Sequence, residues 1–274
     1  LIHGTTSTTA GAFGKLAQHP ALLDRLHAHY EGRILGFNHH TMGCSVAGNV
    51  EQFVTALAAT PGAYTFDVIC HSRGGLLARA LAATGAARPL GDGVVTLPAG
   101  VQLTVDRIAF VATPNAGTAM ARADGIPSLV ERLTNVVNAL PDSAGTIAAG
   151  GLLALAGAAV EAALPQLPGI ADQVPNSALQ QALGASATRD RWFALCAEFE
   201  PSGNLVDAVK RGVTDLIFGE QKNDLVVPTD GVATTPFFAL PPERVVHFGP
   251  ERAVHHSSFF QQPEMARVVD WLTT

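Results

Sequence analysis

The sequence predicts an α/β fold with a mostly parallel central sheet and helices on both faces. Short apolar runs typical of strands alternate along the chain with segments of helical spacing, and such alternation produces parallel strands joined by helical crossovers. Within the run 107–113, residues 108–112 are continuously apolar, as expected of a strand covered on both faces. With 274 residues, 47% of them hydrophobic and 15% charged, the chain can bury a sizeable core.

The first half of the chain contributes strands that lead into loops rich in polar residues. A strand end is expected at 1–2, a short strand at 33–37, and another at 66–70, directly before a helix that begins at residue 74. Helical spacing covers 12–29 with a break at Pro20, and Asn49 is a suitable N-cap for a helix running to about residue 59.

The second half continues the alternation after a loop-rich segment. The expected elements are a hairpin within 91–97, strands at 107–113, 191–199 and 245–248, and helices at 177–183, 205–218 and 263–272. The chain starts inside a strand, without an initiator methionine or a signal peptide. We therefore expect that upstream residues preceded it, and both a secreted and a cytoplasmic location stay open.

The amino-acid composition changes in the segment 119–175, between the expected strands at 107–113 and 191–199. From Thr146 to Val160, 15 residues are apolar or small, fewer than the roughly 20 that a membrane-spanning helix needs. A buried pair of core helices is one interpretation. We favour a helical cap, or lid, at 119–175, inserted between core segments 1–118 and 176–274, because an apolar cap would exclude water from a reacting group.

The hexapeptide 70–75, Cys-His-Ser-Arg-Gly-Gly, joins the strand 66–70 to the helix from residue 74. A serine on a sharp turn between a strand and a helix is the context of a nucleophile elbow, and we expect the Ser72 oxygen to be exposed at its tip. Cys70 stands where the G-x-S-x-G pattern has its first glycine, but cysteine is also small. A turn without catalytic meaning is the alternative.

A serine nucleophile needs a base and an orienting carboxylate, which follow in the order Ser, Asp or Glu, His in elbow enzymes. Asp224 lies 224 − 72 = 152 positions after Ser72, and His256 lies 256 − 224 = 32 positions after Asp224. Both are expected in loops at the same edge of the sheet. The alternatives are Asp207, Asp215 and Asp230 for the acid, and His255, His247 and His71 for the base.

A flexible, hydroxyl-rich turn follows the first strand end at His3-Gly4-Thr5-Thr6. Its glycine permits close approach to a ligand, so the turn is a candidate for half of an oxyanion hole. The main-chain N–H of Thr5 would be one donor and that of Arg73 the other, and a threonine hydroxyl would add a third.

Other residues near these loops are candidates for binding substrate. Thr6 and His71 adjoin the expected oxyanion donors, and His39 would form a wall of the site's mouth. A metal site at His39 and His40 is disfavoured, because neighbours on an extended segment point to opposite sides and no acidic partner is suitably spaced.

Composition excludes several classes of function. The formal net charge is −6 and there is no basic patch, which disfavours nucleic-acid binding. The cysteines at 44, 70 and 196 are far apart in the sequence, so we do not expect a zinc site. We expect reduced thiols instead, although a disulfide bond at Cys44 is an alternative. No cofactor is implied.

Five motifs in order resemble the α/β-hydrolase superfamily, and most closely its bacterial lipases and carboxylesterases with a helical lid. They are His-Gly-Thr-Thr-Ser-Thr at 3–8, His-Ser-Arg-Gly-Gly at 71–75, Ala-Thr-Pro-Asn-Ala-Gly-Thr at 112–118, Asn-Asp-Leu-Val-Val-Pro at 223–228 and His-Ser-Ser-Phe-Phe at 256–260. The resemblance maps the nucleophile to Ser72, the acid to Asp224, the base to His256 and the oxyanion amides to Thr5 and Arg73. Serines follow His256 where calcium-dependent lipases have an aspartate, so calcium is not implied.

These features predict a serine hydrolase that cleaves carboxylic esters with hydrophobic acyl or polyester chains. The expected partner is a small-molecule, lipid or polyester substrate, and transient contact of the cap with a lipid interface stays open. The alternatives are an acyltransferase, thioesterase or amidase with the same triad, and a non-catalytic binding or membrane-associating module on the same fold.

Overall fold

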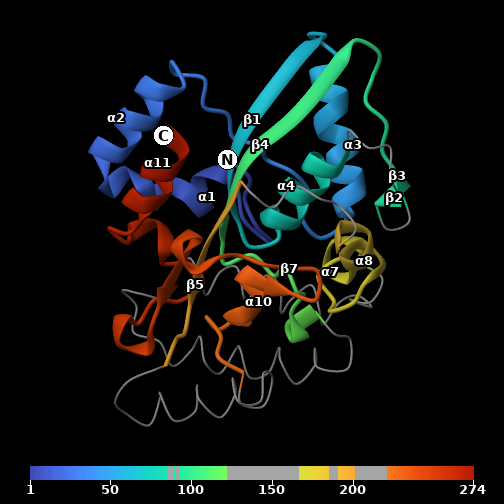
Figure 1. Cartoon of the computed structure of the whole chain (residues 1–274). Helices are drawn as coiled ribbons and strands as arrows, with labels where there is room; N and C mark the ends of the chain where they lie inside the picture. The colour runs from blue at the N-terminus through green and yellow to red at the C-terminus, as the bar shows by residue number, and fades with distance from the viewer. Residues whose placement is uncertain (85–88, 91–92, 122–166, 185–190, 201–220) are drawn as a thin grey trace.

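The computed structural model describes residues 1–84, 89–90, 93–121, 167–184, 191–200 and 221–274 (Figure 1). Its central sheet has the order β1-β4-β5-β8, and all three strand pairs are parallel. The strands are β1 (Gly62–His71), β4 (Val101–Val111), β5 (Trp192–Ala197) and β8 (Val245–Phe248). Single parallel bridges join Ile2 to Cys70 of β1 and to Phe37. The strands expected at 1–2 and 33–37 therefore continue the sheet beyond β1 in the expected parallel direction, but each is reduced to one bridging residue.

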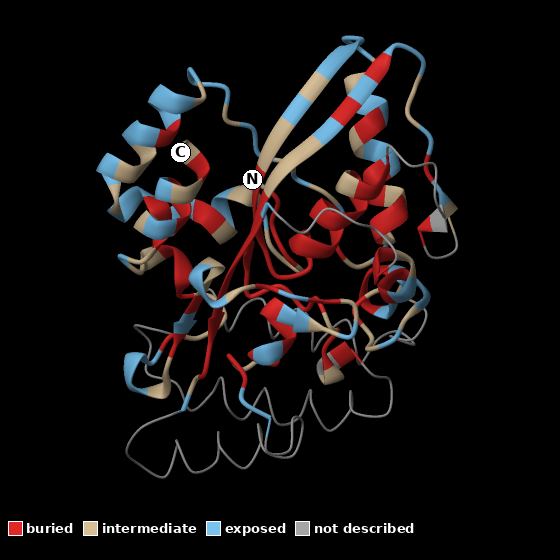
Figure 2. Cartoon of the chain, in the orientation of Figure 1, coloured by how far each residue is buried: buried red, intermediate tan, exposed pale blue. Residues whose placement is uncertain are grey.

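Alternate residues of the strands belong to two separate apolar clusters, one on each face of the sheet. Val68 and Cys70 of β1 face one cluster, while Ile69 faces the other. The first cluster is covered by α3 (Val46–Leu57), α4 (Gly74–Ala83) and α8 (Ala178–Gly184), and the second by α1 (Thr9–Phe13), α2 (Pro20–His29) and α11 (Met265–Thr273). The parallel sheet with helices on both faces is therefore confirmed, and its strands are mostly buried where the layers meet (Figure 2).

Some element boundaries differ from the prediction. Helix α3 begins at Val46, because the Ser45 side chain accepts a hydrogen bond from the Gly48 N–H; Asn49 lies inside the helix and is buried. Strand β4 begins at Val101 rather than at residue 107, since it pairs with β1 along its whole length, with a register shift between Phe66 and Asp67. That pairing depends on the neighbouring strand and not on the local pattern.

Smaller elements surround the sheet. A two-residue antiparallel pair, β2 (Pro89–Leu90) with β3 (Gly93–Val94), lies at the expected hairpin, while α10 (Asp230–Ala233) and the pair β6 (Thr234–Thr235) with β7 (Phe238–Ala239) were not expected. The helix predicted at 205–218 and most of the predicted cap lie outside the described residues, as does the apolar run 146–160. No helix in the described part of the chain is both long and apolar enough to cross a membrane.

Replacing Gly75 with alanine should destabilise the protein by about 1–3 kcal/mol, the usual cost of overpacking a core. A Cβ at this position would lie 2.2 Å from Thr113 Oγ1 and 2.3 Å from its Cγ2, where α4 packs on the sheet. Urea unfolding would measure the loss. Gly14→Ala is the matched control, because its Cβ would meet nothing within 4 Å; equal stability losses in the two variants would contradict the prediction.

Candidate active site

The turn between β1 and α4 places Ser72 in the left-handed region, with φ 53°. This conformation is strained for a residue with a side chain, and here it is held by a hydrogen bond from the Ser72 N–H to the Val111 carbonyl (2.9 Å). Gly74 is required after it, because a Cβ there would lie 2.4 Å from the Ile2 oxygen. The local sequence therefore forms a sharp strand-turn-helix corner with the serine at its tip.

Ser72 as a whole is largely buried, with 5% of the residue accessible; the exposure of its oxygen stays a prediction. The loop after the first bridging residue packs directly on it: a Cβ added to Gly4 would lie 2.5 Å from Ser72 Cβ and 3.1 Å from Ser72 Oγ. Electrostatic interactions of a group this far buried are stronger than in water.

Asp224 and His256 are brought together by a direct hydrogen bond, from His256 Nδ1 to Asp224 Oδ2 (2.9 Å). The carboxylate is almost fully buried, with 1% of the residue exposed. Its other oxygen, Oδ1, accepts from the N–H groups of Val226 (3.0 Å) and Val227 (2.8 Å). These bonds fix the orientation of the carboxylate and leave Oδ2 for the imidazole.

The backbone holds the same pair in place. The His256 N–H donates to the Asp224 carbonyl (3.0 Å), and the Asp224 N–H donates to the Val227 carbonyl (3.1 Å). Leu225 takes φ 85° in the turn between them. Because Nδ1 donates to the carboxylate, a neutral His256 has its lone pair on Nε2, the state that a general base needs.

His71 links this pair to the elbow. Its Nε2 lies 2.8 Å from the His256 carbonyl, and the two rings lie 4.8 Å apart between centroids. A carbonyl only accepts, so Nε2 carries the proton and donates. Burial is the main cause that lowers the pKa of His71 to about 3, and the nearby His256 lowers it further, so the ring is neutral. In this structure His71 holds the backbone of His256; contact of His71 with substrate, as expected from the sequence, stays a prediction.

The other candidate acids and bases lie in different contacts. The main-chain N–H of His255 donates to Ser258 Oγ (2.8 Å), and the His247 ring lies 4.0 Å from the Glu198 carboxylate. Asp230 is exposed at the first residue of α10. Asp207 and Asp215 lie outside the described residues. Among the described groups, the hydrogen bond to Asp224 is made by the His256 ring, which favours His256 over His255 as the candidate base.

The Gly4–Thr5 peptide is oriented by a buried histidine. His3 Nδ1 lies 2.9 Å from the Gly4 carbonyl, to which it donates, and His3 Nε2 accepts from the His39 N–H (3.2 Å). No peptide bond among the described residues is cis. The C=O and N–H of a trans peptide point in opposite directions, so the Thr5 N–H points away from His3.

The Arg73 N–H is oriented in the same way. The Ser72 carbonyl accepts from the Gly75 N–H (3.0 Å), which directs the Arg73 N–H away from the start of α4. Within the described part of the chain, neither the Thr5 N–H nor the Arg73 N–H donates a hydrogen bond. Two unpaired N–H groups beside Ser72 could receive a developing negative charge.

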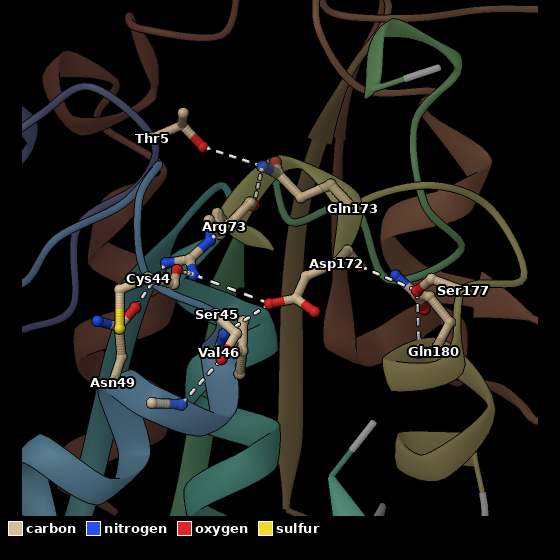
Figure 3. Close-up of polar contacts among 12 residues, drawn as sticks. Thr5, Cys44, Ser45, Val46, Asn49, Arg73, Asp172, Gln173, Ser177 and Gln180 are labelled. Carbon is tan, nitrogen blue, oxygen red and sulfur yellow. Dashed lines mark hydrogen bonds and ion pairs between the residues drawn. The ribbon is translucent and has the colours of Figure 1, made fainter. Parts of the chain in front are cut away.

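The Arg73 side chain makes contacts that the sequence did not reveal (Figure 3). It is fully buried and donates from Nε to the Gly169 carbonyl (3.0 Å) and from its terminal nitrogens to Asn49 Oδ1 (3.0 Å) and the Cys44 carbonyl (2.7 Å). Asp172 lies 4.0 Å away. Burial lowers the pKa of Arg73 to about 10, so it stays charged near neutral pH. The cation ties the elbow to α3 and to α7 (Pro168–Ala171).

His39 and Thr6 both contact residues of the 3–6 turn or of the segment beside it. The His39 ring stacks between His3 (centroids 4.2 Å apart) and Phe37 (5.3 Å), and burial lowers its pKa to about 3. Thr6 has φ 54° and donates its N–H to Thr41 Oγ1 (3.0 Å). These contacts support the loop; contact of either residue with substrate stays a prediction.

The described histidines, cysteines and carboxylates also bear on metal binding and on thiol chemistry. No cluster of three or more His, Cys, Asp or Glu side chains suited to a metal occurs in the described ranges. All three cysteines are free thiols, and burial raises the pKa of both Cys70 and Cys196 to about 12. Such thiols are not nucleophilic at neutral pH.

The sheet order, the elbow and the Asp224–His256 pair define an α/β-hydrolase fold that resembles bacterial lipases. The chain belongs to the family described as a domain of unknown function, DUF7379, whose model matches residues 1–273. No curated protein matches the sequence.

Solved structures are similar to it at low sequence identity. Phospholipase PlaB from Legionella pneumophila is 15% identical with a TM-score of 0.50, over 84% of this chain and 44% of that one. The mature lipase BlEst2 from Bacillus licheniformis is also 15% identical with a TM-score of 0.50, over 100% of this chain and 90% of that one. The chain thus spans less than half the length of the phospholipase, and these similarities establish the fold.

Proposed function

We propose that the protein is a serine hydrolase that cleaves carboxylic esters through an acyl-enzyme intermediate. The observation that carries the proposal is the buried Asp224–His256 hydrogen bond beside an elbow that holds Ser72 at φ 53°. An orienting carboxylate, an imidazole with its Nε2 lone pair available and a serine on a strained turn are the parts of a nucleophilic triad.

In this mechanism Ser72 Oγ attacks the ester carbonyl while His256 Nε2 takes the hydroxyl proton. The Asp224 carboxylate stabilises the imidazolium, and the Thr5 and Arg73 N–H groups bind the oxyanion. Collapse of the tetrahedral intermediate breaks the ester C–O bond, and His256 protonates the leaving alcohol. Water then attacks the acyl-enzyme, with His256 as base, and releases the acid and free Ser72.

The proposed substrates are esters with hydrophobic acyl chains or polyester segments. The apolar composition of 146–160 supports an oily substrate and a cap that meets a lipid interface transiently. Two of the proteins with similar structures are a phospholipase and a lipase, which agrees with ester chemistry. An acyltransferase, thioesterase or amidase would use the same groups and differ in the accepted nucleophile or leaving group.

A fluorophosphonate probe and a series of p-nitrophenyl esters test the proposal. The probe should label Ser72, as located by peptide mass spectrometry, and turnover should rise from acetate to longer acyl chains. Product analysis with added alcohol or amine distinguishes hydrolysis from transfer. A protein that neither reacts with the probe nor releases p-nitrophenol would instead be a non-catalytic module.

Replacing Asp224 with asparagine should lower kcat by about 10⁴-fold, as in other triads. The Asn amide can keep its oxygen on the Val226 and Val227 N–H groups, but its NH₂ would then face His256 Nδ1. The imidazole would carry its proton on Nε2 and could not accept from Ser72. Kinetics on a p-nitrophenyl ester measure the loss. Asp230→Asn, an exposed residue, is the control, and an equal loss there would contradict the prediction.

A further inference from the structure

We propose that Gln173 is a positioning residue that holds the Thr5 hydroxyl as a third donor to the oxyanion. The inference rests on the proposed ester hydrolysis and assigns to that site a residue from the end of the predicted cap. Gln173 lies just after α7 and is buried. Its Nε2 lies 3.2 Å from Thr5 Oγ1 and 3.0 Å from the Gly169 carbonyl (Figure 3).

The orientation of the Gln173 amide follows from its partners. The Gly169 carbonyl can only accept, so the NH₂ end of the amide and not its oxygen must face it. The same nitrogen faces Thr5 Oγ1, and its two hydrogens serve the two contacts. Thr5 Oγ1 is therefore an acceptor towards Gln173, and its own hydrogen must point elsewhere.

The Thr5 hydroxyl hydrogen has no protein acceptor among the described residues. Thr5 follows Gly4, the residue that packs on Ser72 Cβ and Oγ, and its main-chain N–H is also unpaired. One residue therefore offers two donors beside the nucleophile. Because the Thr5 hydroxyl already accepts a hydrogen bond from Gln173, its own hydrogen is free to be donated to another group. A donor fixed in place before the reaction stabilises a developing oxyanion.

The Gly169 carbonyl joins both sides of the hole. It accepts from Gln173 Nε2 and from Arg73 Nε, each at 3.0 Å, so one carbonyl connects the side chains that hold Thr5 and Arg73. Glycine is required there, because a Cβ would lie 2.1 Å from the Thr41 carbonyl oxygen. The Gln173 carbonyl is itself held by the Thr118 N–H (2.9 Å). The segment 169–173 is thus anchored to the core at the oxyanion residues.

The test compares kcat and KM for p-nitrophenyl ester hydrolysis in single and double variants. Thr5→Val should lower kcat about 10²-fold, as loss of an oxyanion donor does, and Thr5→Ser should retain most activity. Gln173→Met should lower kcat about tenfold, the equivalent of one hydrogen bond, with KM little changed. In the Thr5→Val background, Gln173→Met should have no further effect on kcat. Independent, multiplying losses would overturn the proposal.

Two further variants separate positioning from folding. Gln173→Glu is nearly isosteric, but its carboxylate would accept the Thr5 hydroxyl proton and turn it from the substrate, so kcat should fall further than in Gln173→Met. Gln180→Met is the matched control, since this buried glutamine donates to the Pro114 carbonyl (3.1 Å) and does not touch Thr5. It should lose stability without losing kcat. Equal kcat losses at 173 and 180 would assign Gln173 a merely structural role.

Failure of this inference differs from failure of the proposed function. If wild-type protein is labelled at Ser72 and hydrolyses the ester, but Gln173→Met and Gln173→Glu keep full kcat, only the role of Gln173 is wrong. If wild-type protein shows no labelling and no turnover, the proposed function is wrong, and the role of Gln173 falls with it.

Discussion

Replacing Ser72 with alanine should lower kcat for ester hydrolysis by about 10⁶-fold, the loss seen when a triad nucleophile is removed. Without Oγ no acyl-enzyme forms, and the remaining oxyanion donors can only assist direct attack by water. The fold should survive, because the elbow is held by backbone contacts such as that from the Ser72 N–H to the Val111 carbonyl.

The measurement pairs steady-state kinetics on a p-nitrophenyl ester with thermal unfolding. Ser7→Ala is the matched control: it removes a serine hydroxyl from the neighbouring loop, where its bond to the Thr8 carbonyl is local. Fluorophosphonate labelling should disappear only in Ser72→Ala. Turnover in that variant within tenfold of wild type would refute the mechanism.

Replacing His256 with alanine should have an effect of the same size, about 10⁶-fold in kcat, since the nucleophile and its base act as a unit. The adjacent His255→Ala is a stringent control. It removes an imidazole one position away, but the bond to Asp224 comes from His256, so kcat should stay within a few fold of wild type.

The two histidine variants also discriminate between the alternatives that the sequence leaves open. A large loss in His255→Ala together with a small one in His256→Ala would reverse the assignment of the base. Large losses in both would show that the loop tolerates neither change, and thermal unfolding would then reveal a common loss of structure.

The sequence by itself predicts the α/β class, the strand-turn-helix context of Ser72 and the order Ser72, Asp224, His256. These depend on local signals: continuous apolar runs, helical spacing, and a serine with two glycines two and three positions later that permit close packing. Local signals predict that a helix or strand exists more accurately than they predict the residues at which it begins and ends. Helix α3 therefore begins at Val46 and not near Asn49, whose side chain accepts from Arg73 instead of capping the helix.

Only the tertiary structure decided which side chains meet. It placed His256 and not His255 on Asp224, buried Ser72 under the Gly4 loop, and directed Arg73 and Gln173 to the same Gly169 carbonyl. No periodicity encodes a contact between residues 73 and 169, because it forms when distant loops pack at one edge of the sheet. A buried donor must find an acceptor in the folded chain, and that requirement selects partners that spacing alone cannot identify.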